Sequence, residues 1–150
     1  MLVLFGLVTV SLGQGAIVVD ASVAVRFVQA DPHWVDQWRD WVESGAMILA
    51  PSHFGHEVAN ALLRNTNVGA MRAQAILAAL FGAGVEMTDR GLPGLLGSIE
   101  LADQHGLTVY DAAYLDFALD IDGALATLDR KLEAAALAEG VEVLTSRPVS

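Results

Sequence analysis

The chain has 150 residues, of which 54% are apolar, and this size and composition suit one folded domain and exclude a disordered or linker-type protein. No cysteine is present, which excludes disulfides, thiolate zinc sites and cysteine nucleophiles. Eighteen acidic residues against eight basic ones give a net charge of -10, so the chain lacks the basic surface that coats nucleic acid without specificity.

The first 19 residues carry no charged side chain, a length close to the roughly 20 residues that span a bilayer. Two features oppose a membrane segment: Gly13, Gln14 and Gly15 interrupt the apolar run, and no basic residue precedes it as in a signal peptide. We therefore predict that residues 1–15 form an apolar extension ahead of the domain, that the protein is cytoplasmic and that it has no stable membrane association. An export signal and a misassigned start are the alternatives.

Beyond residue 15, short β-branched runs alternate with longer helical patterns. The predicted strands are residues 16–19, 47–50, 85–88, 124–127 and 141–144, with a brief extended step at 107–109. The predicted helices are residues 22–29, 33–43, 52–64, 70–81, 95–105, 111–119 and 129–138. Ser22 and Asp31 are suitable N-caps and Gly106 a suitable C-cap. This alternation is typical of parallel strands joined by right-handed crossovers, so residues 16–150 are predicted to form a single three-layer α/β/α domain with a mainly parallel sheet.

Three aspartates lie just beyond predicted extended segments: Asp20 directly follows the first, and Asp111 and Asp129 each follow theirs after one intervening residue. In an open parallel sheet, functional groups gather beyond the carboxyl ends of the strands, near the switch point of the topology. Each aspartate alone is explained as the N-cap of the helix that follows it, a common use of Asp. Three of them at one edge of one sheet are less simply explained as caps, and we predict that they share a site.

A fourth acid, Glu57, lies on the predicted helix 52–64 at the border of its apolar stripe. His53, Asn60 and Arg64 lie along the same edge, so this helix presents a polar seam beside the core. Four carboxylates in one cleft repel one another unless a cation neutralises them. Hard divalent cations prefer oxygen ligands and support phosphodiester hydrolysis, so the four acids predict a metal-dependent hydrolase.

Four segments, in this order, resemble the motifs of the PIN-domain family and, within it, of the VapC-type toxins of bacterial toxin–antitoxin pairs. The segments are residues 17–22, 56–62, 109–115 and 125–132. Each places one motif acid among apolar residues, and the similarity extends from about residue 17 to residue 144. The resemblance implies that residues 16–150 are a single PIN-like nuclease domain.

The resemblance further implies a Mg²⁺- or Mn²⁺-dependent endoribonuclease that a cognate antitoxin holds inactive. The residues that carry over as both catalytic and metal-binding, here called the acidic quartet, are Asp20, Glu57, Asp111 and Asp129. Ser22 and Thr127 carry over as hydroxyl contacts to metal, water or phosphate. Arg26 and Arg64 are candidates to contact RNA phosphate or to pair with the quartet, with surface solvation as the alternative. The apolar lead has no counterpart in the usual start of the family.

Other polar residues near the quartet have both a functional and a structural interpretation. His53 and Glu57 stand four residues apart on one helix face and suit half of a zinc site, but no second pair supports it. Asn60 is a candidate to orient Glu57 by a hydrogen bond. Asp116 lies about 140° around its helix from Asp111 and is expected to be solvated.

Apolar helix faces predict protein partners. Trp34, Trp38 and Trp41 form one apolar stripe, for which packing in the core or against a partner is favoured over stacking on bases. Together with Leu63 and the apolar helix 70–81, this stripe is expected to form the walls of a groove for an amphipathic helix. The net charge of -10 predicts that the antitoxin segment bound there is basic, and a remaining helical face predicts a homodimer.

Two other functions remain open from the sequence. A catalytically silent PIN-like module would only bind a protein partner, although acids at all four motif positions favour catalysis. An aspartyl phosphoryl-transfer enzyme would use Asp20 as its nucleophile, but Ser22 stands where the phosphatase pattern has a second aspartate. The RNA target depends on surface contacts and RNA shape, which no motif in the chain encodes.

Overall fold

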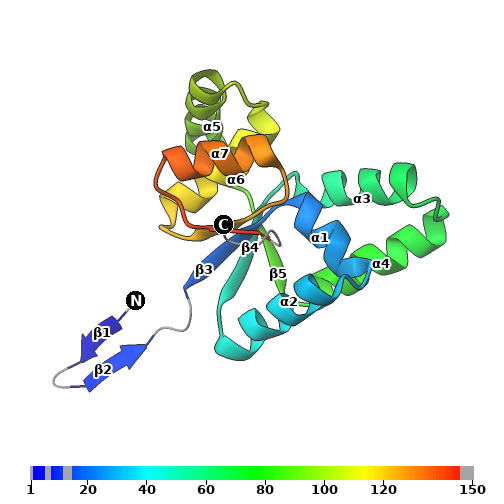
Figure 1. The fold of residues 1–150 in the computed structure, drawn as a ribbon, viewed down its shortest axis with the longest axis horizontal. Helices are drawn as coiled ribbons and strands as arrows, with labels where there is room; N and C mark the ends of the chain where they lie inside the picture. The colour runs from blue at the N-terminus through cyan, green and yellow to red at the C-terminus, as the bar shows by residue number, and fades with distance from the viewer. Residues whose placement is uncertain (1, 6–7, 12–14, 146–150) are drawn as a thin grey trace.

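The computed structural model describes residues 2–5, 8–11 and 15–145 of the chain. A five-stranded parallel sheet forms the middle layer, with the strand order β5-β4-β3-β6-β7 (Figure 1). Its strands are β3 (Ala16–Val19), β4 (Met47–Pro51), β5 (Val85–Thr88), β6 (Ala124–Ala126) and β7 (Val143–Leu144). The helices between them are α1 (Ala21–Val28), α2 (Pro32–Ser44), α3 (Phe54–Asn65), α4 (Ala70–Gly82), α5 (Gly91–His105), α6 (Val109–Asp120) and α7 (Arg130–Ala138).

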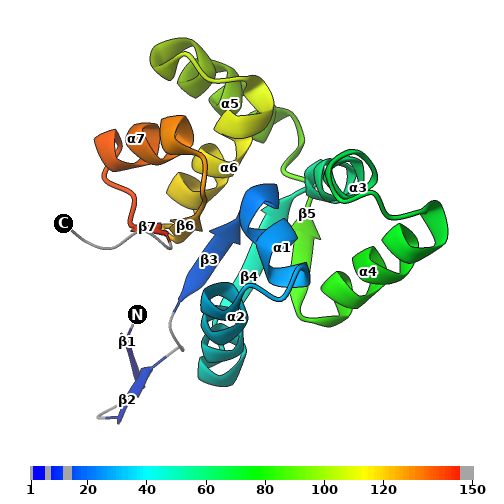
Figure 2. The ribbon, with the colours of Figure 1, turned by 45° about the vertical axis from the view of Figure 1, so that its right-hand side comes forward.

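Helices cover both faces of the sheet, with α1 to α4 on one face and α5 to α7 on the other (Figures 1 and 2). Right-handed crossovers produce this arrangement, because the chain runs from β3 through β4 to β5 in one direction and then returns to β6 beside β3. The predicted three-layer α/β/α fold with a mainly parallel sheet is confirmed. The direction reverses between β3 and β6, so the switch point lies at the carboxyl ends of these two strands.

The central strand β3 is apolar and β-branched, and this composition explains its burial on both faces. Val18 and Val19 have no exposed surface. The register pairs Val19 with Ala126 of β6, and the backbone N–H of Asp20 donates to the carbonyl of Ala126 over 3.1 Å. The two strands therefore end at the same level, and the residues that follow them face one another.

Two predicted boundaries at the acids are wrong. Residues 107–109 are not a strand, because Thr108 is the N-cap of α6 and its hydroxyl accepts a hydrogen bond from the N–H of Asp111 over 3.0 Å. Asp111 therefore lies in the first turn of a helix and does not follow a strand. The N-cap of α1 is Asp20, not Ser22, because the Asp20 side chain accepts from the first N–H groups of that helix.

Helix α5 begins at Gly91, earlier than predicted, and packs closely on α6. Gly97 permits this approach, because a Cβ at this position would lie 2.3 Å from Asp116 Oδ1. Asp116 is not solvated as expected: its Oδ2 lies 2.6 Å from Arg90 Nη1, and the two side chains are only 17% and 14% exposed. The same guanidinium also forms an ion pair with Asp120, whose Oδ2 lies 3.2 Å from Arg90 Nη2.

The tryptophans of α2 belong to the core, which corrects their expected place on a partner surface. Trp34, Trp38 and Trp41 are at most 4% exposed. Trp38 stacks on Phe27 of α1 with ring centroids 4.2 Å apart, and its indole N–H donates to the carbonyl of Ala83 over 3.0 Å. Their helical spacing therefore marks the face of α2 that packs inward.

The predicted apolar extension is partly described. It contains an antiparallel hairpin, β1 (Leu2–Phe5) and β2 (Val8–Ser11), whose strands form a two-stranded sheet of their own. The rest of the extension (residues 1, 6–7 and 12–14) and the end of the predicted domain (residues 146–150) lie outside the described residues. Among the helices that the structure describes, none is long and apolar enough to cross a bilayer.

Candidate active site

Asp20 lies at the carboxyl end of β3 and is 5% exposed. Its Oδ1 accepts hydrogen bonds from the backbone N–H groups of Ser22 and Val23 over 2.9 and 3.3 Å. Burial raises the pKa of Asp20 to about 6, although hydrogen bonds from Ser22, Thr127 and the backbone oppose the shift. Asp20 is thus a helix cap and, at the same time, a buried carboxylate at the switch point of the sheet.

Two hydroxyls connect Asp20 to the start of α7. Thr127 donates to Asp20 Oδ2 and accepts from the N–H of Asp129 over 3.0 Å. Ser22 donates to Asp20 Oδ1 and accepts from the N–H of Leu128 over 3.1 Å. Thr127 has no exposed surface, and its hydroxyl is directed at Asp20. The two hydroxyls hold the first and last acids of the quartet in a fixed relation.

Asp129 follows β6 and is the N-cap of α7. Its Oδ1 accepts from the N–H groups of Lys131 and Leu132, each over 2.9 Å. Among the described residues no hydrogen bond engages its Oδ2, and the residue is exposed. One oxygen therefore fixes the carboxylate, and the other is available to a ligand.

Glu57 extends from α3 and is held by two aromatic side chains. Its Oε1 accepts a hydrogen bond from the Tyr114 hydroxyl over 2.6 Å and lies 3.2 Å from His53 Nε2. Burial alone would raise the pKa of Glu57, but the hydrogen bonds from His53 and Tyr114 and the charge of His53 together lower it. His53 Nε2 also lies 3.0 Å from the carbonyl oxygen of Tyr110. Because both neighbours of this nitrogen are acceptors, it carries a proton.

The pKa of Asp111 reflects the charges of two other members of the quartet. Burial raises its pKa, and the negative charges of Asp129 and Glu57 raise it further. Burial, the hydrogen bond to Glu57 and the charges of Glu57, Asp20 and Asp111 raise the pKa of Tyr114, so this phenol stays protonated. Glu57, Asp20 and Asp111 therefore lie within electrostatic reach of the buried Tyr114 hydroxyl, and Asp129 lies within reach of Asp111.

The donor set of the quartet fits a hard divalent cation. All four members are carboxylates, the ligand type that Mg²⁺ and Mn²⁺ prefer. A cation between them relieves the repulsion that raises the pKa of Asp111. Over the part of the chain that the structure describes, no three His, Asp or Glu side chains already stand close enough to hold an ion.

Asn60 does not orient Glu57 as expected. Its Oδ1 accepts a hydrogen bond from Arg64 Nε over 2.9 Å on the exposed side of α3. Arg26 lies 3.7 Å from Asp31 at the other end of α1. In the contacts of the described residues, neither arginine pairs with the acidic quartet.

Tyr114 is the residue of the site that sequence reasoning missed. It is 1% exposed and lies one helical turn after Asp111, so both side chains lie on the same side of α6. That three-residue spacing is the available signal. Its partner Glu57 is 57 residues away along the chain, so the contact itself depends on the fold.

Comparisons with known proteins concern the family and the fold of the chain. A family model described as "PIN domain" matches residues 17–138. No curated protein matches the chain in sequence. Several solved structures share the fold at low sequence identity.

Three of these structures illustrate the likeness. PAE2754 from Pyrobaculum aerophilum has a TM-score of 0.64 at 21% identity, covering 85% of this chain and 88% of that chain. A chain of VapBC2 from Rickettsia felis, bound to a DNA fragment from their promoter, has a TM-score of 0.66 at 14% identity, covering 87% and 98%. VapC20 from Mycobacterium tuberculosis, a sarcin–ricin loop cleaving toxin, has a TM-score of 0.63 at 18% identity, covering 79% and 94%.

Proposed function

This chain belongs to the PIN-domain family, and on that premise we propose that it is a metal-dependent endoribonuclease. The observation that carries the proposal is the acidic quartet at the switch point, where Asp111 responds to the charges of Asp129 and Glu57. The proposed cofactor is Mg²⁺, with Mn²⁺ as the alternative. When bound, the cation activates a water for attack on an RNA phosphodiester and stabilises the leaving oxygen.

The surrounding groups keep the carboxylates ready for the ion. A lowered pKa keeps Glu57 ionised at neutral pH, and Asp20, with a pKa of about 6, is largely ionised there as well. Tyr114 remains a hydrogen-bond donor and fixes the position of Glu57. Ser22 and Thr127 fix the position of Asp20.

Removing one ligand tests the proposal. We expect Asp111→Asn to reduce RNA cleavage by at least about 100-fold, because even residues that only support metal ligands contribute 10–100-fold. Excess EDTA should abolish RNA cleavage by the wild-type protein, and added Mg²⁺ or Mn²⁺ should restore this cleavage. Cleavage is measured on purified RNA and by transcript sequencing after brief induction, with circular dichroism as the check on folding.

The matched control is Asp103→Asn, because Asp103 is an exposed aspartate on α5 outside the quartet. It should cleave RNA at the wild-type rate. Undiminished cleavage by Asp111→Asn, or by the wild-type protein in EDTA, contradicts the metal site. Metal binding without cleavage of any RNA favours the catalytically silent module. Asp20 is a poor candidate for a phosphoryl-transfer nucleophile, because it is 5% exposed and both its oxygens accept hydrogen bonds.

The cellular role that we propose is that of the toxin in a cytoplasmic toxin–antitoxin pair. Two structures with the same fold support it: VapC20 is described as a toxin that cleaves the sarcin–ricin loop, and VapBC2 was solved on DNA from its own promoter. The net charge of -10 supports a basic antitoxin segment, since opposite charge speeds association and favours the right partner.

The antitoxin surface that we propose lies on α3 and α4. Leu63 is 52% exposed and Met71 is 84% exposed. A hollow of about 390 Å³ is lined by the end of α1, by α3 and by α4, and its lining includes Leu62 and Arg72, the chain neighbours of Leu63 and Met71. Exposed apolar side chains along two helices suit an amphipathic helix of the partner. The tryptophans of α2 no longer belong to this surface, because they are buried.

Leu63→Glu and Met71→Glu are each expected to reduce co-purification with the product of the adjacent gene by about 10-fold or more, because each places a charge in an apolar contact. RNA cleavage by the free variants should be unchanged. Val42→Glu is the control, since Val42 is 53% exposed but lies on α2. Normal complex formation by both test variants would place the partner on another surface.

Helix α5 supports a homodimer. Leu92, Leu96 and Ile99 repeat at helical spacing and are 64%, 57% and 48% exposed. A continuous apolar face of this kind suits an isologous contact with a second copy of the chain. We propose this face as the dimer interface, separate from the antitoxin surface on α3 and α4.

A further inference from the structure

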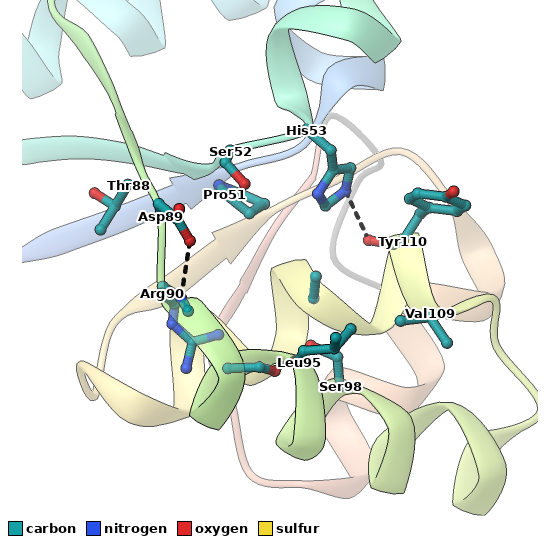
Figure 3. Close-up of a pocket in the computed structure, with 13 residues that line it drawn as sticks. Pro51, Ser52, His53, Thr88, Asp89, Arg90, Leu95, Ser98, Val109 and Tyr110 are labelled. Carbon is teal, nitrogen blue, oxygen red and sulfur yellow. Dashed lines mark hydrogen bonds between the residues drawn. The ribbon is translucent and has the colours of Figure 1, made fainter.

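A pocket opens beside the acidic quartet, between the ends of β4 and β5 and the helices α5 and α6 (Figure 3). Its volume is about 170 Å³. His53 belongs to both features, because it lines the pocket and its Nε2 lies 3.2 Å from Glu57 Oε1. A ligand group in the pocket and a phosphate at the quartet can therefore belong to one nucleotide or to neighbouring ones.

The two ends of this pocket differ in chemistry. Figure 3 shows Asp89 and Arg90 at one end, and Tyr110 at the other, beside His53. Tyr110 is 65% exposed, and its ring centroid lies 5.5 Å from that of His53, so an aromatic face is available to a flat ligand. The walls between the two ends are mainly apolar, with Pro51, Leu95, Val109 and Ala113, and they also carry the hydroxyl residues Ser52, Thr88 and Ser98.

The charged groups of the pocket favour a neutral ligand with hydrogen-bond donors over a phosphate. The Arg90 guanidinium is already engaged by Asp116 at 2.6 Å and Asp120 at 3.2 Å. Asp89 uses Oδ1 to accept from the N–H of Gly91 over 2.8 Å, and no other residue in the described chain hydrogen-bonds to its carboxylate. The pocket therefore offers a carboxylate oxygen, which only accepts hydrogen bonds.

We propose that this pocket binds one unpaired nucleobase next to the scissile phosphate and selects guanine, an inference that rests on the proposed nuclease function. Unstacked bases of single-stranded RNA are recognised by aromatic contacts and by hydrogen bonds on their Watson–Crick edge. Guanine carries two neighbouring donors on that edge, N1–H and the N2 amino group, whereas each other base carries one donor group. When the Watson–Crick edge of guanine faces Asp89, the attached sugar extends past His53 and Tyr110, towards the quartet.

The decisive variant is Asp89→Asn, because the amide keeps an oxygen for Gly91 N–H and replaces the free acceptor with a donor. The substrates are short single-stranded RNAs that differ only in the nucleotide beside the cleaved bond. The wild-type protein should cleave the guanine-containing RNA about 10-fold faster or more than the other RNAs, and Asp89→Asn should lose that preference, so that the ratio of the two rates falls to about one. Leu95→Trp fills the pocket and should remove the preference by a second route. Asp103→Asn should retain it.

A binding measurement separates the pocket from the nuclease. Amide shifts of the full chain are followed by NMR during titration with guanosine 5′-monophosphate and, for comparison, adenosine 5′-monophosphate. Guanine-dependent cleavage that Asp89→Asn removes supports the proposal. Cleavage with no base preference, or with a preference that Asp89→Asn leaves unchanged, overturns the pocket and leaves the nuclease. Shifts around Asp89 and Ser98 that the variant lacks, without cleavage of any RNA, support the pocket and overturn the nuclease. If the protein neither cleaves RNA nor shows these amide shifts, the proposed pocket and the proposed nuclease function are both overturned.

Discussion

Asp20→Asn is expected to abolish RNA cleavage and, at neutral pH, to stabilise the metal-free protein. Cleavage should fall by at least about 100-fold, because the substitution removes one of the carboxylates that we propose as metal ligands. In the absence of a cation, the Asp20 carboxylate is charged at pH 7.5 although it is only 5% exposed. A pKa of about 6, against an ordinary value of 3.8, makes the free-energy penalty of that charge about 3 kcal/mol.

The direction of the pH dependence follows from the raised pKa. Folded Asp20 binds its proton more tightly than the unfolded chain does, so the penalty is absent well below pH 3.8, grows as pH rises, and is complete above pH 6. At pH 4.5 about 1 kcal/mol of it is present. The advantage of Asp20→Asn in unfolding free energy should therefore be about 2 kcal/mol larger at pH 7.5 than at pH 4.5. Asp20→Asn also removes the carboxylate oxygen that accepts the hydrogen bond from Thr127. The free-energy cost of this loss is independent of pH, so it cancels when the values at pH 7.5 and pH 4.5 are subtracted.

Denaturant unfolding in EDTA at the two pH values measures this effect, with Asp103→Asn as the control that should show no such change. Saturating Mg²⁺ should stabilise the wild-type protein and remove the advantage of the variant, because the ion binds the folded state. Its affinity should fall as pH drops, since protons compete with the ion for the carboxylates. An advantage of equal size at both pH values would contradict a buried, titrating Asp20.

Gly97→Ala is expected to reduce the free energy of unfolding by about 2–4 kcal/mol, although alanine normally stabilises a helix interior relative to glycine. The new Cβ would lie 2.3 Å from Asp116 Oδ1 and 2.8 Å from its Cγ. The Asp116 carboxylate cannot simply turn away, because its Oδ2 pairs with the largely buried Arg90 at 2.6 Å. Either α5 moves away from α6, or this pair breaks.

Thermal unfolding gives the measurement, and the expected loss corresponds to a Tm lower by about 5–12 °C for a domain of this size. Gly82→Ala is the matched control, because no atom lies within 4 Å of a Cβ built there, and it should be neutral or slightly stabilising. In an Asp116→Ala background, Gly97→Ala should cost much less, since the clashing group is gone. An equal cost in both backgrounds would show that the contact with Asp116 is not the cause.

Local patterns were sufficient to predict the layers of the fold and the positions of three acids. The β-branched run of β3 and the aspartate directly after it identify both a buried strand and its carboxyl end. Asp129 was predicted in the same way from the end of β6. Glu57 was identified from helical periodicity alone, because it borders the apolar stripe of α3.

Some boundaries and contacts were not predictable from apolar periodicity. Residues 107–109, with the strand former Val109, were predicted as a brief extended step, but the Thr108 N-cap begins a helix there. Helix α5 begins at Gly91, ahead of its predicted start at residue 95, and Gly97 permits its close packing on α6. The contact between Tyr114 and Glu57 joins residues that no local window contains.

The hydrogen bond between Thr127 and Asp20 has a consequence for protein synthesis. The two residues are 107 positions apart, and β6 reaches β3 only after the chain has formed β4, β5 and the helices between them. A ribosome makes the chain from its N-terminus, and contacts between distant residues form late. A nascent chain that ends before residue 127 has neither the hydroxyl that holds Asp20 nor the carboxylate of Asp129. Stalled or truncated translation products therefore lack an assembled site, and the cell meets the proposed ribonuclease only once nearly the whole domain has been translated.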